Sequence, residues 1–220
     1  AVGMTVAVLI ALWVEDEISF DKYHSNYDRI AQLMQHQTWN GKVNTQEANP
    51  AVTGEEIRNL YGSDFSHVLQ ALWNFDHIIT YGDKMFLKPG AFFEPGVADM
   101  LSLEMIYGSR NGLADMNSIM MAESVAASYF ADENPIGKIV RLDNKVDVKV
   151  TGVYKDLPYN TSFKDMTIIL PWSLYLSQNK WVRDMDDQWD SNFTRTFAMI
   201  GNHIDMESAS EKIKHVKLNR

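Results

Sequence analysis

The first fourteen residues constrain the fold of this chain more than any other stretch. Ala1–Val14 carry no charge, and only Gly3 and Thr5 among them are not hydrophobic. A helix of this length spans about 21 Å, which is shorter than the roughly 30 Å hydrocarbon core of a bilayer. The run is therefore either the end of a membrane-spanning helix or a short buried helix. We expect the former, so that the soluble composition from Glu15 onward begins at a membrane surface.

The remaining composition is that of a folded domain. Of the 220 residues, 22% are charged and 45% are hydrophobic, which is ordinary for a globular protein. The formal net charge of -9 argues against nucleic acid and against docking on anionic lipid, because both attract basic surfaces. The chain has no cysteine, which excludes disulfides, thiolate zinc sites and thiol nucleophiles.

The part that follows the acidic break predicts helix, strand, helix and a hairpin. Phe20, Tyr23, Tyr27 and Ile30 recur every three to four residues. This spacing predicts a helix that continues out of the apolar run, with its aromatic stripe packed on the core. The further expected elements are a strand at 30–39 ended by Asn40-Gly41, a helix capped by Asn49-Pro50 and closed by Gly62, and paired strands at 68–80 and 84–93.

The rest of the chain continues with short strands between helices. The expected elements are a strand at 118–121, a helix at 123–130, a turn at Pro135-Ile136-Gly137, a hairpin of 138–142 and 146–154 around Asp143-Asn144, strands at 166–170 and 193–200, a short helix at 172–176 and a final helix with Asp205 as N-cap. Short strands without long parallel crossovers predict the α+β class.

No motif predicts catalysis. The six histidines His24, His36, His67, His77, His203 and His215 show no metal-ligand spacing, and we expect them to be surface or half-buried. The acidic group Asp184, Asp186, Asp187 and Asp190 lacks the glycine and glutamate of a calcium loop, so we expect a solvated loop. There is no nucleophile elbow and no phosphate loop. We therefore predict no catalytic, cofactor-binding or metal-ligating residue, and no cofactor; a membrane-anchored hydrolase is disfavoured, and substrate-binding residues are unknown.

Two stretches resemble a known family. Val14–His24 (VEDEISFDKYH) followed by Tyr27-Asp28-Arg29-Ile30 resembles the juxtamembrane segment of MacB/FtsX-like ABC transporter permeases. Ser118–Leu142 (SIMMAESVAASYFADENPIGKIVRL), continuing to Val150–Pro158 (VTGVYKDLP), is similar to a second segment of the same family. One departure is Ala131, where the family often has glycine, and a left-handed cap there would strain alanine.

The resemblance implies a two-lobed periplasmic domain. Its expected parts are the end of the first transmembrane helix (1–14), a porter-like α/β subdomain in two pieces (15–93 and 162–220) and an inserted sabre-like subdomain (94–161). We expect no single undivided sheet to run through both subdomains. We also expect the apolar run to pack against another surface.

The function that the resemblance implies is mechanical. The chain would be the periplasmic domain of a permease in the bacterial inner membrane, transmitting an ATP-driven conformational change across the membrane for export or extraction of a substrate. It would not be an enzyme, because ATP hydrolysis belongs to a separate ABC ATPase subunit. Other implied partners are a second permease copy, forming a dimer, and a periplasmic adaptor or outer-membrane component. The alternative is the extracytoplasmic sensor or ligand-binding domain of a membrane receptor.

Overall fold

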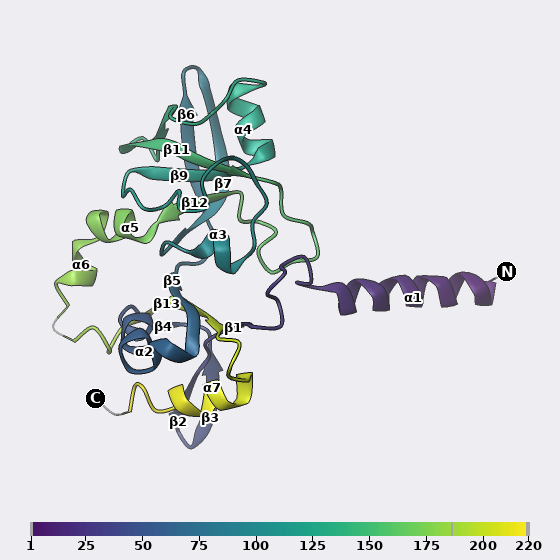
Figure 1. Ribbon diagram of the computed structural model, residues 1–220, viewed down its shortest axis with the longest axis vertical. Helices are drawn as coiled ribbons and strands as arrows, with labels where there is room; N and C mark the ends of the chain where they lie inside the picture. The colour runs from purple at the N-terminus through teal and green to yellow at the C-terminus, as the bar shows by residue number, and fades with distance from the viewer. Residues whose placement is uncertain (1, 186, 219–220) are drawn as a thin grey trace.

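The computed structural model describes residues 2–185 and 187–218. The strands and short helices form two halves, one above the other in Figure 1, and one helix projects sideways from between them. The domain combines helices with a sheet of parallel and antiparallel strands, which agrees with the predicted mixture of helices and strands.

The projecting helix is α1 (Val2–Ser19). Figure 1 shows it extending away from the body, with only its C-terminal end close to other elements. The large apolar side chains from Met4 to Val14 are 42 to 77% exposed, so the expectation that they pack against another surface is wrong for this chain on its own. Ala1 lies outside the described residues. Across residues 2–185 and 187–218, no helix combines the length and the apolar character needed to cross a bilayer.

The lower half is a three-stranded antiparallel sheet with two helices on one face. The strand order is β1 (Ile30–Gln32), β13 (Asn192–Ile200) and β5 (Phe65–Ala71), and the short β4 (Asn49–Pro50) also pairs with β13. Helices α2 (Thr53–Tyr61) and α7 (Met206–Ile213) cover one face. Ile57, Val68, Ala198 and Val216 form the small core on that side.

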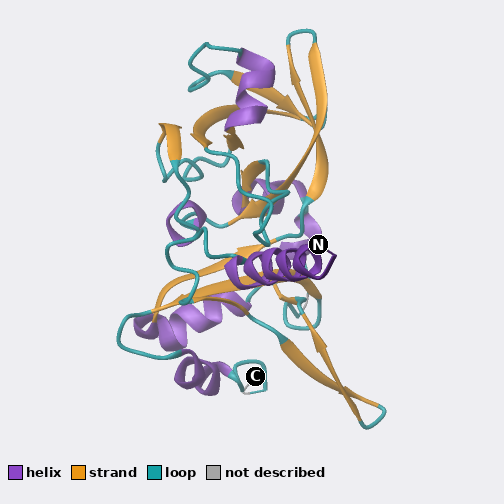
Figure 2. Cartoon of the chain, turned by 90° about the vertical axis from the view of Figure 1, so that its right-hand side faces the viewer, coloured by secondary structure: helices purple, strands orange, loops and turns teal. Residues whose placement is uncertain are grey.

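The opposite face of this sheet joins the main core. Side chains alternate along a strand, so Phe197 and Met199 point away from Ala198 and belong to the larger buried cluster. Two further elements extend this half. The 3-10 helix η1 (Gly62–Asp64) follows α2, and β2 (Gln35–Trp39) and β3 (Lys42–Gln46) form a separate hairpin. Figure 2 shows this hairpin projecting at the lower right.

The upper half is built on a closed ring of six strands. Each of them pairs with the next in the order β7, β12, β9, β11, β10 and β6, and β6 pairs again with β7. Their bounds are β6 (Phe75–Tyr81), β7 (Lys84–Phe93), β9 (Ser118–Ala122), β10 (Ile139–Leu142), β11 (Val146–Tyr154) and β12 (Ile168–Pro171). Many apolar side chains of these strands are buried in the main core, and Ile79, Met120, Val150 and Ile169 are among them.

Short helices complete the upper half. Helix α4 (Glu123–Phe130) packs on the β6–β7 hairpin, where the rings of Tyr129 and Phe86 lie 5.2 Å apart and the Tyr129 hydroxyl donates to the Ile79 carbonyl. The other elements are α3 (Val97–Met100), β8 (Met105–Gly108) beside β11, α5 (Trp172–Gln178) and α6 (Lys180–Arg183).

The two halves are continuous through one narrow link. Strands β5 and β7 share a single residue pair, Ala71 with Phe93, flanked by backbone bonds from Leu72 to Phe92 and from Glu94 to Gln70. We expected no single sheet to run through both subdomains, and in this strict sense the expectation is wrong. The β6–β7 hairpin and β12 also pair with strands of segment 94–161. The segment boundaries at 93/94 and 161/162 stay a prediction.

Several local predictions are confirmed. Helix α4 occupies 123–130 as expected, and β10 and β11 form the expected hairpin, in which both Asp143 and Asn144 have positive φ. The carboxylate of Asp205 accepts the Ser208 backbone N–H at 2.8 Å and so caps α7. Ala131 ends α4 with φ 51°, the positive value that is costly for a residue with a Cβ.

Other local predictions are wrong, each because distant partners compete with local pattern. The chain leaves the helix at Ser19, and 20–29 form turns, with Phe20 and Tyr27 both 47% exposed instead of on the core. Asn49-Pro50 does not cap α2, because it pairs as β4 with β13. The expected strands at 30–39 and 68–80 are each divided into two shorter strands.

Candidate functional site: the joint between the N-terminal helix and the body

The chain turns sharply where α1 ends. Asp21 takes a positive φ of 60°, and its backbone N–H donates to the carbonyl of Asn160 at 2.9 Å. The side-chain amide of Asn160 donates to the hydroxyl of Ser19 at 3.1 Å. The last residue of α1 and the first turn after it are therefore both bonded to the loop that connects β11 to β12.

The carboxylate of Asp21 is the centre of this joint. It accepts three hydrogen bonds, each 2.7 Å long, from the Thr161 hydroxyl, the Ser162 backbone N–H and the Ser162 hydroxyl. Burial alone would raise the pKa of Asp21, but these bonds and the nearby His24 hold it below the ordinary value of 3.8. The group is therefore a carboxylate at neutral pH, and bonds to a charged acceptor are stronger than bonds between neutral groups.

His24 extends the joint into the core. It is only 1% exposed; its Nδ1 lies 2.7 Å from the Leu101 carbonyl oxygen and its Nε2 lies 2.9 Å from the Thr161 hydroxyl. The carbonyl can only accept, and the Thr161 hydroxyl gives its hydrogen to Asp21. A chain of bonds connects Leu101, His24, Thr161 and Asp21.

A second set of bonds fixes the next two residues. The hydroxyl of Ser25 donates to Ser102 at 2.6 Å, and the amide of Asn26 donates to the Ser102 hydroxyl at 3.2 Å. On the helix side, a hydrogen bond to Asp16 and its negative charge raise the pKa of Tyr159. Residues 16–26 thus contact two separate loops, at 100–102 and at 159–162. The base of α1 is therefore bonded to the body from two directions.

The histidines and acidic residues named from the sequence do not form a second site. His24 and His77 are buried, contrary to expectation, because each has a specific partner. Asp184, Asp187 and Asp190 are exposed, whereas Asp186 lies outside the described residues. Within residues 2–185 and 187–218, no group of three or more His, Asp or Glu side chains is placed to hold a metal ion.

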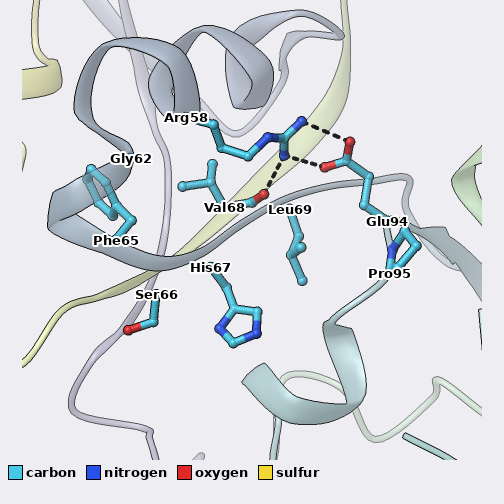
Figure 3. A pocket seen from close by; sticks show the side chains of 9 residues that line it. All are labelled: Arg58, Gly62, Phe65, Ser66, His67, Val68, Leu69, Glu94 and Pro95. Carbon is cyan, nitrogen blue, oxygen red and sulfur yellow. Dashed lines mark hydrogen bonds and ion pairs between the residues drawn. The ribbon is translucent and has the colours of Figure 1, made fainter. Parts of the chain in front are cut away.

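An open pocket of about 500 Å³ lies beside α2 and β5 (Figure 3). Its charged residues are Arg58 and Glu94, which form a two-point ion pair with N–O distances of 2.7 and 3.1 Å. The same guanidinium also donates to the Val68 carbonyl, and the same carboxylate accepts the Gln70 N–H. Both charges are satisfied within the chain, so this pair stabilises the link between α2, β5 and the end of β7.

Comparison with known proteins gives one family and a set of similar structures. The MacB-like periplasmic core domain matches residues 1–216. No match to a curated protein was found.

Three solved structures share the fold. A domain assigned to a permease protein from Porphyromonas gingivalis has a TM-score of 0.66 at 19% identity, covering 89% of this chain and 83% of that one. The periplasmic region of MacB from Actinobacillus actinomycetemcomitans gives 0.62 at 16%, covering 86% and 82%. The extracellular domain of the ABC-type transporter YknZ from Gram-positive bacteria gives 0.57 at 12%, covering 84% and 92%.

Proposed function

Because the chain belongs to the MacB-like periplasmic core domain family, we propose that it carries an ATP-driven movement from the membrane to the periplasmic side through the joint at Asp21. The chain is the periplasmic domain of a MacB-like ABC transporter permease, and this part of such a permease is not catalytic. Permeases of this kind work with an ABC ATPase and dimerise. The force that moves the domain therefore comes from outside it.

The joint is the observation that supports the proposal. Helix α1 projects as a rod, and the residues at its base are bonded through side chains to two loops of the body. Eight of these bonds join residues that are 76 or more positions apart in the sequence. A movement of α1 would therefore pull on the upper ring of strands directly, and no long flexible linker would absorb it.

The exposed surface of α1 supports a place in or against the membrane. Large apolar side chains face outward around the helix, and an exposed apolar surface of this extent is typical of an interaction site. This apolar part of α1 is followed in the same helix by three acidic residues, Glu15, Asp16 and Glu17, whose charged side chains favour water. Lipid below this acidic group and aqueous surroundings above it would satisfy both parts of the helix.

The finer organisation is part of the same proposal. The assignment of 94–161 to the sabre-like subdomain, and of 15–93 with 162–220 to the porter-like one, stays a prediction. The first segment supplies β9, β10 and β11 of the ring, and the other two supply the three-stranded sheet together with β6, β7 and β12 of the ring. A location in the bacterial inner membrane, and a periplasmic adaptor or outer-membrane component as a further partner, stay predictions. The family favours a permease over the sensor domain of a receptor, the alternative that the sequence left open.

A distance measurement tests the coupling. The chain has no cysteine, so single spin labels can be introduced at Leu9→Cys on α1 and at Asp83→Cys on the tip of the β6–β7 hairpin. In the full-length dimer with its ATPase, we expect ATP to change the label-to-label distance between copies at both positions. In the double variant Asp21→Asn, Ser162→Ala we expect the change at position 9 to remain and the change at position 83 to fall by at least half.

The matched control is Asp132→Asn, which changes an exposed carboxylate far from the joint along the chain. It should leave both distance changes as in the unmodified protein. An unchanged response at position 83 in the double variant would contradict the proposal, as would a dimer in which ATP moves neither label.

A further inference from the structure

A second pocket lies between the two halves and is lined largely by aromatic side chains. It has a volume of about 500 Å³, within the range of small-molecule sites. Its wall comes from the β5–β6 connection, β6, β7, the α5–α6 segment and the start of β13. Helices α5 and α6 lie at the left of Figure 1. The aromatic residues are Trp73, Phe75, Phe92, Tyr175, Trp181 and Phe193.

The aromatic wall is braced by its own contacts. The rings of Phe92 and Tyr175 lie 5.4 Å apart, and those of Trp181 and Phe193 lie 4.7 Å apart. Tyr175 stacks in turn on Trp172 at 5.1 Å. Aromatic pairs at these distances attract each other, so the wall is held in place without an occupant. Phe75 and Trp181 are about half exposed and form the rim.

His77 gives the pocket a specific polar group. The residue is 7% exposed, and it lines the pocket together with Asp143. Its Nδ1 lies 2.8 Å from Oδ2 of Asp143, while the other carboxylate oxygen accepts the Ile78 N–H at 2.8 Å. Because the carboxylate accepts, Nδ1 carries a hydrogen, and in the tautomer with that hydrogen alone Nε2 has a free lone pair.

That lone pair has no partner in the described chain. Nε2 is buried and makes no hydrogen bond. Buried polar atoms are nearly always bonded, and an unpaired one is a cost that a bound molecule can remove. Among the described residues, the lining includes no lysine or arginine, so no such positive charge in the pocket attracts an anion.

From this geometry we propose that the pocket binds a small neutral aromatic molecule that carries an O–H or N–H donor. The rings of the molecule lie among Phe92, Tyr175 and Trp181, and its donor is directed at His77, whose buried Nε2 becomes accessible as the molecule enters. This proposal does not depend on the mechanical function, because it concerns a different group of residues. It adds a ligand site where the two halves meet.

A pair of matched probes tests the donor. We expect 2-naphthol to bind the full chain saturably in isothermal titration calorimetry, and 2-methoxynaphthalene, which has the same rings without the donor, to bind at least fivefold more weakly. Equal affinities would overturn the proposal, and so would tighter binding of 2-naphthoate, which would mean that the pocket prefers an acceptor. This comparison needs no variant.

Rim variants locate the site. Trp181→Ala and Phe75→Ala remove half-exposed side chains, and each should weaken 2-naphthol at least fivefold. The control Trp39→Ala removes a 71% exposed tryptophan from the β2–β3 hairpin and should change the affinity less than twofold. An equal loss in Trp39→Ala, or none in the rim variants, would contradict the assignment.

Discussion

At the scale of single residues, Asp21 is the group whose charge matters most. Its carboxylate is held by Thr161 and Ser162, and its pKa lies below the ordinary 3.8. A carboxyl whose pKa is lower in the folded than in the unfolded chain stabilises the fold above its unfolded pKa. That contribution is lost as the pH falls through the lower, folded value.

Asp21→Asn should therefore reduce the free energy of unfolding in a pH-dependent way. At pH 7 we expect a loss of roughly 1 to 2 kcal/mol, from weaker hydrogen bonds to a neutral acceptor at a partly exposed position. Below pH of about 4 the difference between the variant and the unmodified chain should shrink. Urea denaturation at pH 7 and pH 3 measures it. Ser162→Ala should lose part of the same free energy of unfolding. If Asp21→Asn and the unmodified chain differed by the same amount at both pH values, the result would contradict this explanation.

His24 shows why residue-level prediction stopped short of the joint. The sequence offered no ligand spacing for it and predicted a surface or half-buried position. Its two partners are Leu101 and Thr161, which are 77 and 137 positions away. No local pattern contains information on contacts of that range. The resemblance of Val14–His24 to the family segment was the only sequence signal that marked this region.

At the scale of elements, the end of α4 is a point of strain. Ala131 has φ 51° and ψ -120°, where an L side chain is disfavoured. Ala131→Gly should stabilise the chain by about 1 kcal/mol, because relief of the strain exceeds the added freedom of glycine in the unfolded state. Thermal or urea unfolding measures the change.

The control for this substitution lies in the same helix. Ala127 is exposed inside α4, so Ala127→Gly should destabilise by about 1 kcal/mol. The two substitutions are chemically identical and have opposite expected signs. Destabilisation by both would mean that the positive φ at Ala131 carries no cost.

Elements were predictable where their signals were local. The turn residues Asp143-Asn144 and the cap at Asp205 lie within a few positions of the structure they determine. The aromatic spacing of 20–30 is also local and indicates a helix, but the bonds from Asp21 to Ser162 and from Ser25 to Ser102 favour turns. Tertiary contacts outweighed periodicity there.

At the scale of the whole molecule, closure of the ring depends on close approach at Gly90. It pairs with Ile168 across the parallel strands β7 and β12. A Cβ at Gly90 would lie 2.1 Å from Cγ1 of Ile168 and 2.6 Å from its backbone oxygen. Gly90→Ala should therefore destabilise the chain by about 3 kcal/mol, because a backbone atom cannot move away as a side chain can. Urea denaturation provides the measurement.

Gly62→Ala is the matched control. Gly62 has φ -55°, and nothing lies within 4 Å of an added Cβ. Alanine there should stabilise slightly, by roughly 0.5 kcal/mol, through the unfolded state. If Gly90→Ala were as harmless as Gly62→Ala, the ring would not be closed at β7 and β12 in solution.

The overall arrangement was accessible from the sequence only through the family resemblance. Arg141 of β10 pairs with Thr80 of β6, although α3, β8, β9 and α4 lie between these strands in the sequence. The periodicity of residues within one segment cannot specify so distant a partner. Residue patterns gave the class and most elements. They did not give the ring, or the single residue pair that links it to the lower sheet.

Ring closure has a consequence for how copies of this chain meet. Strand edges with free N–H and C=O groups recruit strands from other molecules and promote aggregation, and a closed ring removes them. The outermost strand of the lower sheet, β1, is only three residues long. Free edges are left at the β2–β3 hairpin, whose strands are mostly polar, and along β7 from Lys84 to Pro89, which pairs only with β6. Two copies crowded together on a membrane would therefore meet a free strand edge at these places rather than around the closed part of the ring.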